Sequence, residues 1–192
     1  MSTQQKLIDS ARYLIQTRGY NGFSYADVAE QVQVRKASIH HHFPTKADLA
    51  RAVVEESRAL IVAQTRTLDD GAFDPEAQLR FYTGYWERCI ADGSAPFCVA
   101  GMLASELPTL PTDLAENVRA HFRDLSNWLE TVLTKGAQLG LFELRGSARL
   151  EAESFMSMVY GAMLTARAYG DPKVFADIVD SGLKKLLRHR AG

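Results

Sequence analysis

Three consecutive histidines, His40, His41 and His42, form the densest group of potential metal ligands in the chain. Metal ligands on a helix need a spacing of three or four residues, because neighbouring positions point about 100° apart. No cysteine or acidic residue stands beside this run to complete a site. We therefore predict no metal here, and interpret His40 and His41 as exposed polar contacts and His42 as a packed side chain.

The other reactive side chains form no recognisable catalytic group. The sequence contains no nucleophile–base arrangement, metal motif or phosphate-binding loop, which argues against an enzyme and against a bound cofactor. Cys89 and Cys98 have neither a disulfide framework nor a zinc-binding spacing. Cys98 begins a predicted helix, where a thiol can become reactive, so it is either a redox- or electrophile-sensing group or a small packed residue.

The stretch from Ser24 to Lys46 predicts two short helices joined by a three-residue turn, which is typical of a helix-turn-helix. At about 100° per residue, Ile39 and Phe43 share the inward face of the second helix. The second helix of such a motif lies in the DNA major groove, where small and polar side chains allow close approach to base edges. The residues on or beside the outward face are Lys36, Ala37, Ser38, His40 and His41.

The charge distribution agrees with DNA binding by the N-terminal part alone. Residues 1–50 carry six basic and four acidic residues, whereas the remainder carries 16 basic and 19 acidic residues, for a net charge of −1. Lys46 falls in the first turn of the next predicted helix, where backbone N–H groups and a lysine together can hold a phosphate. The alternative is a helical protein-interaction module whose helix-turn-helix serves only for packing.

Helical periodicity and capping residues extend along the whole chain and predict an all-α protein. Residues 69–72 are the expected boundary between an N-terminal helix-turn-helix domain of three helices, residues 1–50, and a C-terminal helical domain, residues 69–192. A long fourth helix over 46–68 connects them. The nine expected helices cover about 4–18, 24–32, 36–42, 46–68, 75–90, 97–107, 112–139, 147–170 and 172–188.

The sequence shows no feature of a membrane or secreted protein. No segment approaches the ~20 consecutive apolar residues of a membrane span. Residues 1–5 lack the basic and apolar regions of a signal peptide. Because the two cysteines form no disulfide framework, we expect a cytoplasmic protein that does not bind membranes.

Residues 34–49, VRKASIHHHFPTKADL, closely resemble the recognition motif of the TetR/AcrR family of transcription regulators. Arg18-Gly19-Tyr20, Phe23-Ser24 and Val28-Ala29 upstream are similar as well, so the resemblance covers about residues 4–62. It implies a homodimeric repressor that binds near-palindromic double-stranded operator DNA. It also implies release of that DNA when a small-molecule effector, conceivably an electrophile, binds the C-terminal domain.

Two positions depart from the family pattern within this motif. His40 stands where the family usually has tyrosine, and Gln33 stands in the turn where glycine is usual. If Gln33 adopts a left-handed backbone, it costs about 1 kcal/mol relative to glycine. Carried over residue by residue, the resemblance implies DNA contacts at Ser24, Tyr25, Arg35, Lys36, Ala37, Ser38, His40, His41 and Lys46.

The resemblance also implies an effector cavity among the fifth to eighth helices, largely apolar and with few polar groups. The alternative is that these aromatic and methionine side chains simply form the core. His121 and Tyr160 are further polar candidates. The residues we predict for ligand binding are Tyr82, Trp86, Cys98, Met102, Glu106, Arg119, Phe122, Phe155 and Met158.

Small and apolar residues on the last two helices suit a four-helix bundle across a two-fold axis. Packing within one subunit is the alternative. The dimer is favoured because one recognition helix alone reads too few bases for a specific site. The residues predicted for the dimer interface are Gly161, Ala162, Ala166, Ile178, Gly182 and Leu186.

Overall fold

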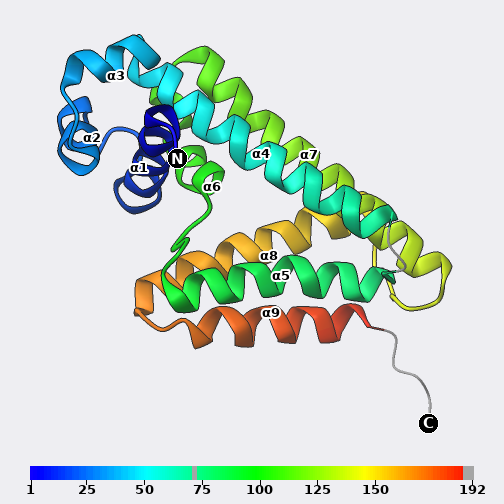
Figure 1. The fold of residues 1–192 in the computed structure, drawn as a ribbon. Helices are drawn as coiled ribbons and strands as arrows, with labels where there is room; N and C mark the ends of the chain where they lie inside the picture. The colour runs from blue at the N-terminus through cyan, green and yellow to red at the C-terminus, as the bar shows by residue number, and fades with distance from the viewer. Residues whose placement is uncertain (71–72, 188–192) are drawn as a thin grey trace. The chain divides into compact units, whose positions relative to one another are not determined.

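The computed structural model describes residues 1–70 and 73–187 of the chain. Within these residues the backbone forms nine α-helices, one short 3-10 helix and no extended strand (Figure 1), which confirms the all-α prediction. The helices are α1 (Thr3–Arg18), α2 (Tyr25–Val32), α3 (Lys36–His42), α4 (Lys46–Asp70), α5 (Pro75–Asp92), α6 (Val99–Ala104), η1 (Leu107–Thr109), α7 (Thr112–Gln138), α8 (Ala148–Tyr169) and α9 (Lys173–Leu186).

Capping side chains start the helices of the helix-turn-helix region where the sequence predicts them. Ser24 precedes α2, and both its N–H and its hydroxyl donate to the Asp27 carboxylate at 2.7 Å. Thr45 repeats this arrangement before α4, with its N–H and hydroxyl donating to Asp48 at 3.0 and 2.7 Å. These caps satisfy backbone groups that have no partner inside the helix.

The sixth and ninth helices are shorter than the sequence predicts. The sixth helix is predicted over 97–107, but α6 is shorter, because Cys98 is still extended and Pro108 has no N–H to continue an α-helical ladder. The ninth helix ends at Leu186, and Leu187 instead pairs with Phe142 in an isolated antiparallel bridge. Residue 188, and residues 71–72 of the expected domain boundary, lie outside the described residues.

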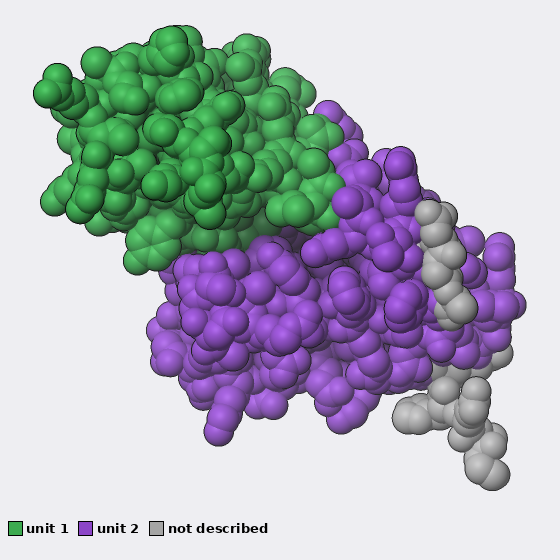
Figure 2. Space-filling view, viewed as in Figure 1, with its two compact units in different colours: residues 1–61, 97–122 green, residues 62–96, 123–192 purple. Residues whose placement is uncertain are grey.

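The chain divides into two compact units, shown in different colours in Figure 2. Unit 1 contains residues 1–61 and 97–122, so it joins the helix-turn-helix to α6, η1 and the first turns of α7. One hydrophobic core runs through all of these elements. The two helices of the helix-turn-helix are therefore packed on a segment that lies far away in sequence. Its fully or nearly fully buried members include Leu7, Leu14, Ile15, Val28, Ile39, Leu49, Val53, Val99, Leu103, Leu114 and Val118.

Unit 2 contains the described residues of 62–96 and 123–192. Within it α5, α8 and α9 lie side by side (Figure 1), and α9 packs against both of the other helices. Apolar side chains at helical spacing fill the space between them, as for Phe155, Val159 and Met163 on α8. In the described part of the chain, no helix combines the length and the apolar character needed to cross a membrane.

Candidate nucleic-acid interface

The second helix of the motif, α3, presents two distinct faces. Ile39 is fully buried and Phe43 is buried directly after the helix ends. His41 lies on the opposite side and is exposed, as are Lys36 and His40, which flank that side. This arrangement follows from the helical period, because side chains three and four positions apart share a face. Arg35 and Ala37 are also exposed, and Ser38 is half-buried.

The turn between α2 and α3 shows which backbone conformation Gln33 adopts in place of the usual glycine. Gln33 has φ 57° and ψ 46°, which is left-handed, and it is the one non-glycine residue with positive φ among those described. The N–H of Val34 then donates to the carbonyl of Ala29 at 3.1 Å. Gln33 therefore carries the cost of about 1 kcal/mol expected for a non-glycine residue at this position.

His40 occupies the position where the family usually has tyrosine. Its ring packs edge-on against Tyr25, with ring centroids 4.9 Å apart. Its Nδ1 lies 3.1 Å from the carbonyl oxygen of Pro44. Because a carbonyl oxygen only accepts, Nδ1 is the donor in this contact.

The other two histidines of the run, His41 and His42, differ in their burial. His42 is half-buried, with its ring edge-on to that of His41 at 5.5 Å between centroids. Among the residues that the structure describes, no three His, Cys, Asp or Glu side chains gather closely enough to hold a metal ion.

Ser24 and Tyr25 begin α2 beside α3. Ser24 is exposed, and its hydrogen bonds to Asp27 lower the pKa of that carboxyl group. Tyr25 is half-buried and donates from its hydroxyl to the carbonyl of Phe43 at 2.8 Å. Burial, aided by the charge of Asp48, raises the pKa of Tyr25 to about 12. The phenol thus stays protonated and joins the start of α2 to the end of α3.

Lys46 is held more closely by the protein than the sequence suggests. Its Nζ donates to the carbonyl of Phe23 at 2.6 Å and lies 4.4 Å from the ring centroid of Tyr20 and 4.5 Å from that of Phe23. Burial lowers the pKa of Lys46, while the charges of Glu106 and Asp27 act in the opposite direction. Lys46 therefore orients the segment that leads into α2.

Glu106, one of the residues predicted to bind an effector, contacts this same segment within unit 1. Its carboxylate accepts from the N–H of Tyr20 at 2.6 Å and from the N–H of Asn21 at 3.0 Å. The buried Gln16 makes a second link, donating to the carbonyl of Phe97 at 2.9 Å. Sequence reasoning missed Asn21 and Gln16, because their partners lie more than 80 residues away and no local pattern marks them.

The other ligand residues predicted in unit 1 differ in their burial and contacts. Cys98 and His121 are only 3% and 2% exposed, and the thiol sulfur lies 3.9 Å from Nε2 of the imidazole. Arg119 is exposed and pairs with Glu116 at 2.6 Å on the same helix. Met102 and Phe122 are half-buried against the core of unit 1.

In unit 2, Tyr82 and Trp86 are buried on α5, and the ring of Tyr82 packs edge-on against Trp128 at 5.8 Å. Phe155 and Met158 line a cavity of about 240 Å³. Gly182 and Leu186, predicted for the dimer interface, line the same cavity.

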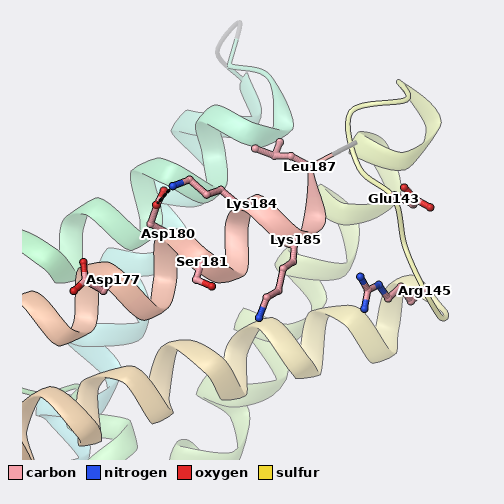
Figure 3. Close-up of a pocket in the computed structure, with 8 residues that line it drawn as sticks. All are labelled: Glu143, Arg145, Asp177, Asp180, Ser181, Lys184, Lys185 and Leu187. Carbon is pink, nitrogen blue, oxygen red and sulfur yellow. Dashed lines mark ion pairs between the residues drawn. The ribbon is translucent and has the colours of Figure 1, made fainter. Parts of the chain in front are cut away.

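A larger cavity of about 600 Å³ lies at the end of α9 and has a charged lining (Figure 3). Lys184 pairs with Asp180 at 2.6 Å beside it. None of the predicted ligand residues lines this cavity. Its lining residues are Glu143, Arg145, Asp177, Asp180, Ser181, Lys184, Lys185 and Leu187.

The predicted dimer residues divide into buried and accessible groups. Ala162, Ala166 and Leu186 are buried within the chain's own packing. Gly182 lies so close to Met158 that it has no room for a Cβ. Gly161 is exposed, with open space where a Cβ would stand, and Ile178 is half-buried.

Two short helices, a three-residue turn and an exposed cationic face define a protein of the helix-turn-helix class. Residues 7–53 match the family model of bacterial regulatory proteins of the tetR family. A solved TetR-family transcriptional regulator from Agrobacterium tumefaciens is 48% identical, with 97% of this chain and 98% of that chain covered and a TM-score of 0.93. The chain belongs to the tetR family, whose members are transcriptional regulators rather than enzymes.

Two curated regulators match shorter segments of the chain. Transcriptional regulator AcuR of Cereibacter sphaeroides is 32% identical over 114 residues, which are 57% of this chain and 51% of AcuR. IcaR of Staphylococcus epidermidis, a negative transcriptional regulator of a biofilm operon, is 35% identical over 52 residues, 27% of this chain and 28% of IcaR. The chain thus spans only 51% and 28% of the lengths of these relatives.

Proposed function

We propose that this chain is a homodimeric transcriptional repressor that binds a near-palindromic operator through α3 and leaves it when a small molecule binds. The exposed face of α3 carries this proposal. Ala37 and His41 lie about opposite the fully buried Ile39, and the exposed Lys36 and His40 flank them, so these side chains can reach phosphates and base edges in a major groove. IcaR, named a negative regulator, supports repression rather than activation.

The remaining predicted contacts have different roles in this proposal. Ser24, Tyr25 and Arg35 contact phosphates and set the register of the protein on the duplex, and Lys46, whose ammonium binds the carbonyl of Phe23, holds the segment before α2 in place for these contacts. Ala37 and Ser38 are small, so they let the backbone of α3 approach the bases. In this proposal residues 1–50 bind DNA, and residues 69–192 bind the ligand and form the dimer contacts. The long helix over 46–68 connects these two parts.

A footprint on genomic DNA tests the DNA-binding part and finds the operator. We expect protection of two half-sites whose centres are one helical turn, about 34 Å, apart. An excess of unrelated duplex DNA serves as the competitor and should leave this protection intact. A protein that protects no segment, or that loses all protection to the competitor, would contradict specific operator binding.

The exposed face of α8 supports the homodimer. Ser157, Gly161, Leu164 and Ala168 are exposed on this helix, and Leu164 is 60% exposed. A two-fold axis brings the same patch of both copies together, and an apolar side chain such as Leu164 gains by this burial.

The size of the particle in solution tests this interface. Leu164→Arg should convert a dimer to a monomer in sedimentation experiments, because it buries an unpaired charge. Leu139→Arg is the matched control, since Leu139 is also 60% exposed but lies just after α7. A monomeric wild-type protein, or a Leu164→Arg variant that stays dimeric, would contradict the proposed interface.

Two buried polar atoms in unit 2 support a small-molecule effector. Oε1 of Gln78 and Nε1 of Trp128 are buried and have no hydrogen-bond partner in the described structure. Leaving such atoms unpaired costs about 1–3 kcal/mol each, which a ligand with its own donor and acceptor would recover. Tyr82 packs against Trp128 and stands one turn from Gln78 on α5. We infer that the effector binds reversibly beside these three side chains.

Compounds that release the operator can be found in a screen and then tested on variants. Trp128→Phe removes the unpaired N–H, and Gln78→Leu removes the unpaired oxygen together with the Nε2 that donates to the carbonyl of Phe73. Each variant should raise the concentration of compound needed for release by about tenfold. Phe81→Leu is the control, because Phe81 is exposed on α5 and the change removes neither unpaired atom. Unchanged release by both variants would rule out this binding place.

A further inference from the structure

The carboxylate of Glu106 makes an unusual set of contacts with the turn that joins α1 to α2. Oε2 accepts from the N–H of Tyr20 at 2.6 Å, and Oε1 accepts from both the N–H and the Nδ2 of Asn21 at 3.0 Å. Thr109, three residues further along, accepts from the same Nδ2 at 3.1 Å. One acidic side chain thus satisfies two consecutive backbone N–H groups that follow the end of a helix.

The backbone before this turn leaves room for that carboxylate. Gly19 ends α1 with φ 76°, a conformation that favours glycine. A Cβ at this position would stand 2.7 Å from Oε2 of Glu106. The close approach of Glu106 therefore depends on glycine at position 19.

The same turn is held from its other side by Lys46. The Lys46 ammonium donates to the carbonyl of Phe23 and lies over the ring of Tyr20. The turn is therefore fixed between a carboxylate that follows α6 and an ammonium at the start of α4. Directly after it stand Ser24, which caps α2, and Tyr25, which binds the end of α3.

The α6 segment is tied to α1 at both of its ends. Phe97, before α6, accepts from Gln16, and Glu106, after α6, holds the turn that follows α1. Between them Val99 and Leu103 are buried in the core of unit 1. A displacement of α6 must therefore either move the turn before α2 or break the Glu106 contacts.

We propose that Glu106 is a positioning residue for operator binding. Its carboxylate links the position of α6 to the position of the N-terminus of α2. This inference rests on the proposed function, because it assumes that α2 and α3 bind DNA. Glu106 itself touches no DNA. Its carboxylate fixes the turn before Ser24 and Tyr25, so that these residues and α3 meet the duplex in one arrangement.

The test compares Glu106→Ala, Glu106→Gln and the control Glu116→Gln. Glu116 is an exposed acidic residue of α7 in the same unit, and its carboxylate pairs with Arg119 on that helix. Two quantities are measured on the full chain: amide hydrogen exchange at Tyr20 and Asn21, and affinity for the footprinted operator over a range of salt concentrations. Thermal melts show whether each variant is folded.

For Glu106→Ala we expect exchange at both amides to become about tenfold faster and operator affinity to fall about tenfold. The dependence of affinity on salt should stay as in the wild type, because Ser24 and Tyr25, the contacts that move, carry no positive charge. Glu106→Gln keeps one oxygen that can accept, so its values should lie between those of the wild type and Glu106→Ala. If Glu106→Ala does not fold, Glu106→Gln gives the same comparison with a smaller change.

Two results would overturn the role of Glu106. Unchanged exchange at Tyr20 and Asn21 in a folded variant would mean that the carboxylate does not hold the turn. Faster exchange with operator affinity equal to the wild type would mean that the turn does not position the DNA contacts. A wild-type protein that binds no DNA would instead contradict the proposed function itself.

Discussion

The hydroxyl of Tyr25 in α2 donates a 2.8 Å hydrogen bond to the carbonyl of Phe43, the residue that ends α3. The ring of the same tyrosine packs against His40 on α3. The two helices of the motif are thus joined by a side chain as well as by the turn at Gln33. Their relative orientation is fixed at the place where DNA contacts are proposed.

Tyr25→Phe removes this hydrogen bond and keeps the ring. We expect the free energy of unfolding in urea to fall by about 1 kcal/mol, because the carbonyl of Phe43 loses its donor. Operator affinity should fall as well. Tyr13→Phe is the control, since Tyr13 is 52% exposed on α1. Equal stability of Tyr25→Phe and the wild type would show that the bond contributes nothing.

The capping boxes of α2 and α4 predict how stability depends on acid. Hydrogen bonds from Ser24 and Thr45 lower the pKa of Asp27 and Asp48 below 3.8 in the folded protein. A lowered folded pKa adds stability above the unfolded value, and this stability is lost as pH falls through the folded pKa.

The double variant Asp27→Asn, Asp48→Asn should therefore be less stable than the wild type at pH 7. Its free energy of unfolding should also fall less steeply below about pH 4, because asparagine does not titrate. Urea unfolding followed by circular dichroism at several pH values measures both effects. Asp113→Asn is the control, and curves of equal steepness for the double variant and the wild type would contradict the capping role.

Gly19 and Glu106 should show an energetic coupling. Gly19→Ala alone should destabilise the protein by about 1 kcal/mol or more, because alanine disfavours positive φ and its Cβ would meet the carboxylate. In the double variant with Glu106→Ala the clash is absent, so the loss should be smaller than the sum of the single losses. Urea unfolding of all four proteins gives the coupling, and strict additivity would argue against the close approach.

The two cysteines should react at different rates with an alkylating agent. Cys98 is 3% exposed beside His121, whereas Cys89 on α5 is only half-buried. N-ethylmaleimide followed by mass spectrometry should modify Cys89 on the order of tenfold faster in the folded protein, because Cys98 must wait for local opening. Faster reaction at Cys98, with release of operator DNA, would favour an electrophilic effector and contradict reversible binding as the only mode.

The local features of the motif could be predicted from the sequence. The bounds of α3, the capping box at Ser24 and the burial of Ile39 all depend on residues within a few positions of each other. Periodicity and capping rules operate over this range. The same local rules mark Gln33, because it stands in the turn at a position where glycine is usual.

The contacts across long sequence separations could not be predicted. Nothing near Glu106 indicates that its carboxylate binds the backbone of Tyr20, 86 residues earlier. The inward direction of Lys46 depends in the same way on the carbonyl of Phe23, 23 residues away. Such contacts arise only when the core of unit 1 brings α6 against α1.

The salt dependence of operator affinity for Lys36→Ala tests the central claim most directly. If the exposed face of α3 binds DNA, the variant should bind the footprinted operator more weakly, and the slope of log affinity against log salt should fall by about one. Lys173→Ala, an exposed lysine at the start of α9, should keep the wild-type affinity and slope. An unchanged affinity and slope for Lys36→Ala would contradict the placement of α3 on DNA.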